Sequence, residues 1–168
     1  MRAITLLLTL LLTACASYSG AGLRPGEAGF NDVVGLMGQP VMRWQDPDGS
    51  VQLAYPRGPA GIHTYMVKMG ADGRLRSIEN VLDETVFARI QAGMTKEQVL
   101  RVLGPPDSLR TAYFKARDEL VWDWRACTYN VNMQRIYVLF DATAGTVRST
   151  MSEDELFGHE GIAIPCVR

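Results

Sequence analysis

Five side chains of this sequence belong to the types that most often act as nucleophiles, proton carriers or metal ligands: three cysteines and two histidines. His63 and His159 stand far apart, each close to glycines, and no residues around them complete a set of nucleophile, base and orienting group. No group of histidine, cysteine and carboxylate residues has the spacing of a metal site. We therefore expect no catalytic residue, no metal site and no cofactor. A hydrolase that uses one of the histidines is the alternative from the enzyme class.

The first cysteine, Cys15, follows a segment that is typical of an export signal. A positively charged start is followed by an apolar run over residues 4–12, which is shorter than the about 20 residues of a membrane-spanning helix. Leu12-Thr13-Ala14-Cys15 resembles the lipobox of bacterial lipoproteins. That resemblance implies a signal peptide over residues 1–14 and acyl chains such as palmitate on Cys15. A plain signal peptide with an accidental cysteine is the alternative.

The residue after Cys15 bears on the destination of the exported chain. In the lipoproteins that this segment resembles, an aspartate there retains the protein in the inner membrane, whereas this chain has Ala16. The resemblance therefore implies a lipid anchor in the outer membrane, with the protein facing the periplasm.

Because disulfides persist in oxidising compartments, we expect Cys127 and Cys166 to form a disulfide. Two separate thiols are the alternative.

Charge and composition narrow the classes of partner. The 168 residues include 17 basic and 18 acidic side chains, with a formal net charge of −1. A nucleic-acid-binding protein would need a basic patch, so the sequence predicts no nucleic-acid partner. The small and polar residues 15–22 are typical of a flexible tether between a membrane anchor and a folded domain.

The rest of the chain repeats itself. Residues 23–40 and 90–106 both end in an aliphatic residue, a glycine, any residue and a proline. Further on, residues 65–77 match residues 137–149, with tyrosine, glycine, arginine and serine identical at a constant offset. We therefore predict two tandem units, over residues 23–82 and 83–151, followed by a C-terminal tail over residues 152–168.

The predicted fold class is α+β, in which each unit has two short helices followed by a three-stranded antiparallel meander. In the second unit, residues 83–91 form the first helix, and Thr95 with Gln98 forms a capping box before a helix that ends at Gly104. Apolar residues then alternate along strands at residues 120–125, 135–141 and 146–151, and residues 108–114 add a strand before them. A last short helix starts at Ser152.

Residues 90–99 (IQAGMTKEQV) and 103–106 (LGPP) resemble the SmpA/OmlA (BamE-like) family of outer-membrane lipoproteins. The first copy resembles the family less, since it lacks the Met-Thr capping pattern. As a tandem repeat, the chain is also similar to the β-lactamase inhibitor protein, whose two repeats form one concave sheet that grips a protein. The resemblance implies a fold of helix, helix and meander, and association with the β-barrel assembly machine.

Together these observations predict a non-enzymatic outer-membrane lipoprotein that acts as a periplasmic protein-binding module, in outer-membrane protein assembly or envelope integrity. Its partners would be envelope proteins, and the membrane through its lipid anchor. The alternative is an inhibitor-like module that binds a periplasmic enzyme. We predict that Tyr65 and Tyr137 lie at equivalent places on exposed sheet faces and contact the partner. Trp122 and Trp124 lie either in the core under the helices or in an exposed aromatic patch.

Overall fold

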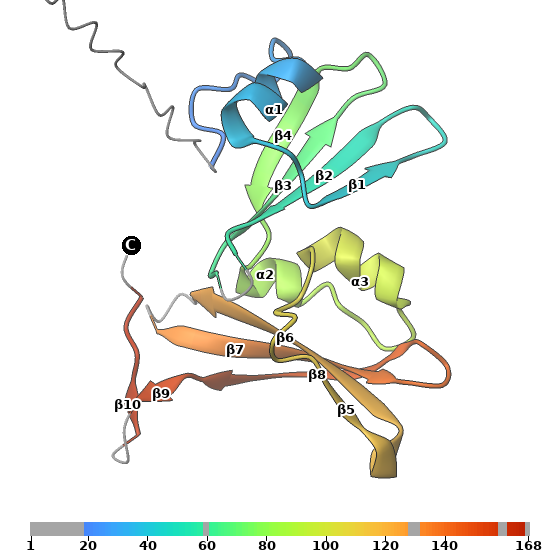
Figure 1. The fold of residues 1–168 in the computed structure, drawn as a ribbon, viewed down its shortest axis with the longest axis vertical. Coiled ribbons are helices and arrows are strands. Elements are labelled where there is room, and N and C mark those ends of the chain that lie inside the picture. The colour runs from blue at the N-terminus through green and yellow to red at the C-terminus, as the bar shows by residue number, and fades with distance from the viewer. Residues whose placement is uncertain (1–18, 59–60, 128–131, 158–160, 167–168) are drawn as a thin grey trace, which may run out of the picture.

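The computed structural model describes residues 19–58, 61–127, 132–157 and 161–166, and their elements stack in four layers (Figure 1). Helix α1 (Phe30–Met37) covers a first sheet, helices α2 (Glu84–Phe87) and α3 (Lys96–Leu103) form the next layer, and a second sheet lies beyond them. The first sheet has the order β1 (Met42–Gln45), β2 (Val51–Pro56), β3 (Thr64–Met69), β4 (Leu75–Asn80). The second has the order β5 (Ala112–Phe114), β6 (Glu119–Cys127), β7 (Met133–Asp141), β8 (Val147–Asp154), and the 3₁₀ helix η1 (Lys115–Arg117) follows β5. A small hairpin of β9 (Leu156–Phe157) and β10 (Ile162–Ala163) ends the described chain.

The predicted capping box of the second unit is confirmed. The Thr95 amide donates to Gln98 Oε1 at 2.8 Å, and the Gln98 amide donates to Thr95 Oγ1 at 3.3 Å. Two of the amides that have no partner inside helix α3 are thereby satisfied. The helix ends at Gly104, whose φ of 73° is a conformation that favours glycine. Helix α2 begins at the predicted place but ends at Phe87, earlier than predicted.

The first unit has one helix among its described residues, where two were predicted. Helix α1 corresponds to α3, because both end at the glycine of the repeated motif, Gly38 in α1 with φ 84°. The segment before it carries Gly20, Gly22 and Gly26, all with positive φ, a conformation that interrupts a helix. The segment therefore forms turns where the second unit has α2.

The turns of the two meanders differ by one residue, which shifts the register of the repeat. Met69 pairs with Leu75 around the first turn, and Phe140 pairs with Val147 around the second, which is one residue longer. The constant offset between the two copies matches equivalent residues after the turn, but before the turn it matches residues that are not equivalent. Tyr65 therefore corresponds to Ile136, and the predicted equivalence of Tyr65 and Tyr137 is wrong.

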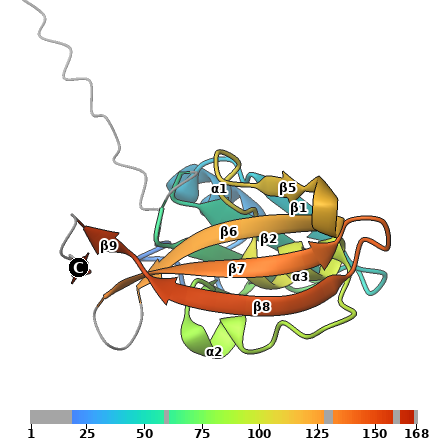
Figure 2. The same cartoon turned by 90° about the horizontal axis from the view of Figure 1, so that it is seen from below.

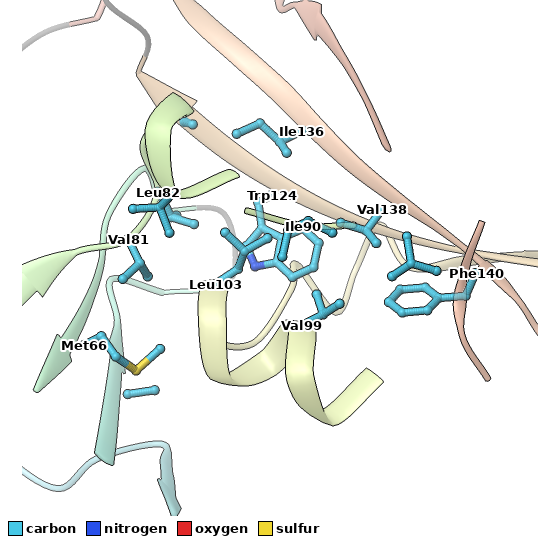
Figure 3. Packing of buried hydrophobic residues seen from close by; sticks show 14 of the residues in the cluster. Met66, Val81, Leu82, Ile90, Val99, Leu103, Trp124, Ile136, Val138 and Phe140 are labelled. Atoms are coloured by element: carbon cyan, nitrogen blue, oxygen red, sulfur yellow. The ribbon is translucent and has the colours of Figure 1, made fainter. Parts of the chain in front are cut away.

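The apolar residues form two clusters. The first lies between α1 and the first sheet and includes Val33, Met37, Leu53, Val67 and Leu75. The second surrounds α2 and α3 and takes residues from both sheets (Figure 3). Its buried members are Trp44, Ala54, Met66, Val81, Leu82, Val86, Ile90, Val99, Leu103, Trp124, Ala126, Ile136, Val138, Phe140 and Val147. The first sheet is thus buried on both faces and the second on one.

The tryptophans of β6 belong to the core. Trp124 is buried, and Trp122 packs its ring edge-on against the Phe140 ring, with centroids 4.7 Å apart. The prediction that the two side chains lie under the helices is confirmed, and the alternative of an exposed aromatic patch at these residues is wrong. The alternation along β6 follows from the pleat, since successive side chains point to opposite faces.

Three further expectations need correction. The first sheet has a fourth strand, β1, beyond the predicted three-stranded meander, whereas the fourth strand of the second sheet, β5, lies within residues 108–114, where an added strand was predicted. The two sheets lie in separate layers, so they do not join edge to edge into one concave surface. The helix predicted from Ser152 is instead the end of β8, where backbone pairing with β7 continues to Asp154.

Polar contacts also join the two units. The Arg101 guanidinium of α3 donates to the Asp46 carboxylate at 2.7 Å and lies 5.7 Å from the centroid of the Trp44 ring. The carbonyl of Arg101 accepts from Gln52 Nε2 at 2.6 Å. These contacts join α3 to the first sheet beside the shared core.

Candidate functional site

The side of the second sheet that faces away from α2 and α3 is referred to here as the outer face. Alternation along the strands gives this face Val121 of β6, Tyr137 and Leu139 of β7, and Met151 of β8, which are cross-strand neighbours. Figure 2 views the molecule from this side and shows β6, β7 and β8 in front of the helices. Within the described residues, no helix covers this part of the sheet.

A shallow groove of about 220 Å³ lies on the outer face. Its floor and walls are Phe114, Arg117, Glu119, Val121, Tyr137, Leu139, Met151 and Glu153. Phe114 is 44% exposed and Met151 is 48% exposed, while Val121 and Leu139 are half-buried between them. The groove thus has an apolar floor and a charged rim, the composition of a protein-contact surface.

The rim side chains are held in place by one another. The Arg117 guanidinium lies 4.6 Å from the centroid of the Phe114 ring and makes an ion pair with Glu119 at 2.8 Å. Arg148 donates to the Arg117 carbonyl at 2.8 Å and pairs with Asp141 at 2.7 Å. Because these contacts hold Phe114 and Arg117 in place before a partner arrives, less conformational entropy is lost when the partner binds them.

Tyr137 lies at the centre of the outer face, and its hydroxyl donates to Glu153 Oε1 at 2.6 Å. Desolvation raises the pKa of Tyr137 far above its ordinary value of 10.0, and the hydrogen bond to Glu153 raises it further. The phenol therefore stays neutral and acts as a hydrogen-bond donor, with its ring free to contribute apolar contact.

A buried charge cluster lies at the other end of the outer face. Arg135 faces three carboxylates: Asp123 at 3.2 Å, Glu155 at 3.5 Å and Asp107 at 3.8 Å. Burial raises the pKa of Asp123 although Arg135 acts against it. Burial acts in the same direction on Glu155, but hydrogen bonding to Arg125 and the charge of Arg135 give its carboxyl a lowered pKa. The cluster occupies its end of the sheet with satisfied polar groups, so the groove is the part that offers apolar contact.

The tail returns to the sheet at this cluster. The Glu155 amide donates to the Met133 carbonyl at 2.8 Å, and the Met133 amide donates to the Ile164 carbonyl at 2.7 Å. A disulfide joins Cys127 at the end of β6 to Cys166, with Cα atoms 5.9 Å apart. The hairpin of β9 and β10, which lies between these two cysteines in the sequence, exposes Leu156, Phe157 and Ile162.

The structure separates the side chains that the sequence placed together. Tyr137 lies on the outer face of the second sheet, but Tyr65 packs on the first apolar cluster under α1 and stacks on His63, with centroids 5.9 Å apart. Burial, together with the nearby Arg57 charge, lowers the pKa of His63. Cys15 with its lipobox (Leu12, Thr13 and Ala14) and His159 lie outside the described residues.

The sequence reasoning missed Phe114 and Met151, the two most exposed apolar side chains of the groove. The signal that could have found them is cross-strand pairing. Met151 lies opposite Tyr137, and Phe114 lies two residues from Ala112, which pairs with Val121. In the described part of the chain no group of histidine, cysteine or carboxylate residues could hold a metal ion, and no helix has the length and apolar character to span a membrane.

Comparison with known families covers the part of the chain that carries the outer face. Residues 79–150 match the family model described as the outer membrane protein assembly factor BamE domain. This range runs from the end of β4 through the first half of β8 and includes the groove up to its last two residues, Met151 and Glu153. Searches of curated proteins and of solved structures found no match. The family resemblance of residues 90–106 is therefore confirmed, and residues 79–150 form a domain of the BamE, or SmpA/OmlA, family.

Proposed function

We propose that this protein is a lipid-anchored outer-membrane protein that acts in the periplasm as a non-enzymatic protein-binding module in outer-membrane protein assembly. Its contact site is the groove on the outer face of the second sheet. The family description, an assembly factor of the outer membrane, supports the process and the compartment. The observation that carries the contact site is an apolar groove on a sheet face that no described helix covers.

The chemistry of the groove favours a protein partner. Interfaces depend on a few aromatic, methionine and arginine anchors surrounded by a polar rim. Phe114, Tyr137 and Met151 supply such anchors within one groove, and Arg117 stacks on Phe114 beside them. The inhibitor-like alternative depended on one concave sheet shared by both repeats, and two separate sheets give it no support.

The envelope location rests on the N-terminal sequence. A signal peptide over residues 1–14, lipidated Cys15 and a disulfide between Cys127 and Cys166 fit an exported chain. Radioactive palmitate should label the wild-type protein, and C15S should remain an uncut, unlabelled precursor. Labelling of the mutant at the wild-type level would show that Cys15 carries no lipid. Peptide mapping without reductant should recover the linked cysteines, and two thiols open to alkylation would contradict the disulfide.

The contact site can be tested with two matched double variants. F114S/M151S removes both exposed anchors of the groove, and L156S/F157S removes two exposed apolar side chains of the tail hairpin as a control. We expect co-purification of envelope proteins from detergent-solubilised membranes to fall about tenfold for the groove variant, since each anchor contributes about 1 kcal/mol or more. The control should retain the wild-type yield. Equal yields from both variants, with unchanged melting temperatures, would show that the groove is not the contact site.

A further inference from the structure

The edge of the second sheet beside the groove offers backbone groups for pairing. We propose that β8 binds an extended segment of the partner as a fifth strand, so that the partner is recognised through its backbone as well as through the groove. This inference rests on the proposed function, because it names the chemical form of the ligand at the same face. The ligand class is an extended polypeptide with alternating apolar and polar residues.

Among the sheet edges in the described residues, β8 is the long uncovered one. β1 and β5 are short edge strands of four and three residues. The edge strand β4 is shorter, with six residues, and four of them are half-buried. Its first residue, Leu75, donates its amide to Ala28 and accepts from Gly26 at its carbonyl, both at 2.8 Å. β8 has eight residues, and every side chain after Val147 is exposed. Long open edges pair with other chains unless they are blocked.

The covered part of β8 is confined to its first residue. The Val147 amide donates to the Met94 carbonyl and its carbonyl accepts from Gly93, both at 2.8 Å. Further along, Glu155 points its amide at Met133 of β7. Because antiparallel ladders alternate, the amides of Thr150 and Ser152 point away from β7. No described residue outside β8 accepts from them through its backbone.

The surroundings of this edge define the ligand further. Ser149, Met151 and Glu153 lie on the outer face, and Met151 and Glu153 also line the groove. An added strand would therefore place alternate side chains beside Met151, where apolar residues fit. Glu153 and Asp154 are exposed at the far end of β8, which favours a basic residue of the ligand there.

A second copy of the chain fits this edge less well. Antiparallel self-pairing centred on Met151 would place Arg148 of one copy opposite Asp154 of the other. The Arg148 guanidinium already binds Asp141 and the Arg117 carbonyl, so it cannot move to Asp154 without losing both contacts. Self-pairing would also bring Glu153 and Asp154 of the second copy to the same edge, and these two carboxylates add negative charge there. The lysines of a basic ligand strand would instead neutralise the carboxylates of β8.

The test uses the full-length lipidated protein in detergent and a ten-residue peptide of alternating valine and threonine with two lysines at one end. N-methylation of the valines blocks one edge of the peptide strand, and N-methylation of the threonines blocks the other. We expect one methylated peptide to bind at least tenfold more weakly than the parent and the other within twofold. Equal affinity of both methylated forms, or no binding of the parent peptide, would overturn the inference.

Variants of β8 give a second test of the added strand, and they leave the fold of the protein unchanged. T150P and S152P remove one outward amide each, a position where an edge strand tolerates proline, while T150A and S152A keep the amide. Peptide binding should fall about tenfold in the proline variants only, and bound peptide should slow hydrogen exchange at the Thr150 and Ser152 amides. If the proline variants lose neither peptide nor envelope partner while F114S/M151S loses the partner, the groove function stands and the strand inference fails. A dimer that disappears in T150P would replace the ligand strand by a second copy and also overturn it.

Discussion

The two sheets of this molecule share one supersecondary plan but differ in what covers them. The first sheet lies between α1 on one face and α2 and α3 on the other, and both of its faces carry buried side chains. The second sheet uses one face for the same helices and leaves the outer face uncovered in the described part of the chain. The first sheet thus supports the core with both faces, whereas the second sheet keeps one face that can meet a partner.

The difference can be followed along the central strands. In β3 the consecutive residues Met66 and Val67 are both buried, one in each apolar cluster. In β7 burial alternates, so that Val138 and Phe140 are buried whereas Tyr137 and Leu139 are half-exposed. A strand that is buried on both sides has no face left for binding, which places the candidate site in the second sheet.

The largest expected effect compares two phenylalanines on opposite faces of the second sheet. F140A removes a side chain with 0% exposure and should lower the free energy of unfolding by about 3–5 kcal/mol. F114A removes a ring that is 44% exposed and should cost less than about 1 kcal/mol. Chemical denaturation of both variants measures the contrast. Similar losses would mean that the outer face is as buried as the inner face.

The next prediction concerns the core that the two units share. M66A should lower the free energy of unfolding by about 2–5 kcal/mol, because Met66 fills space between the first sheet and α3. Fluorescence of Trp44, isolated in W122F/W124F, and of Trp122 with Trp124, isolated in W44F, should report one transition at one denaturant concentration. Two separate transitions would show that each unit folds alone and would break the claim of a shared core.

A smaller effect is expected at the charge cluster that holds the tail. E155Q should lower the free energy of unfolding at pH 7 by about 1–2 kcal/mol, because Glu155 loses its charge toward Arg125 at 2.7 Å and Arg135. The folded pKa of Glu155 is lowered from its ordinary value of 4.5, so its contribution is present above that value and is lost as the pH falls through the folded pKa.

The stability gap between wild type and E155Q should therefore stay constant from about pH 7 to 5.5 and close below about pH 4. Asp123, whose pKa shifts in the opposite direction, is common to both proteins, so the difference isolates Glu155. Denaturant titrations at several pH values measure the gap. A gap that widens toward acid would contradict the stated direction of the shift.

The smallest effect sharpens the comparison at two equivalent core positions. Tyr55 and Trp124 occupy the same register in their units, and the Tyr55 hydroxyl and the Trp124 indole nitrogen are buried without a hydrogen-bond partner among the described residues. Y55F removes one such atom and should raise the free energy of unfolding by about 1 kcal/mol. Differential scanning calorimetry should show a rise of about 2–4 °C. A fall in melting temperature would mean that the hydroxyl has a partner after all.

How far the sequence led can be judged from particular residues. The capping box at Thr95 and the glycine ends of α1 and α3 could be predicted, because these signals are local to the backbone. The face on which Tyr65 lies could not be predicted, because the turn of the second meander has one extra residue. A shift of one residue in the alignment of the two copies assigns a side chain to the opposite face of its strand. The stacking of α2 and α3 between two sheets depends on one apolar cluster that brings together residues far apart in the sequence, such as Met66 and Leu103, and no local pattern contains that information.

The central claim is that the outer face of the second sheet, and no face of the first, meets the partner. Site-specific photo-cross-linking in intact cells tests it most directly, with a photoreactive phenylalanine at Leu139 in the groove and, as control, at the exposed Asn31 of α1. The account predicts a discrete cross-linked envelope protein from position 139, lost in the F114S/M151S background, and none from position 31. Cross-links from position 31 with none from position 139 would contradict it.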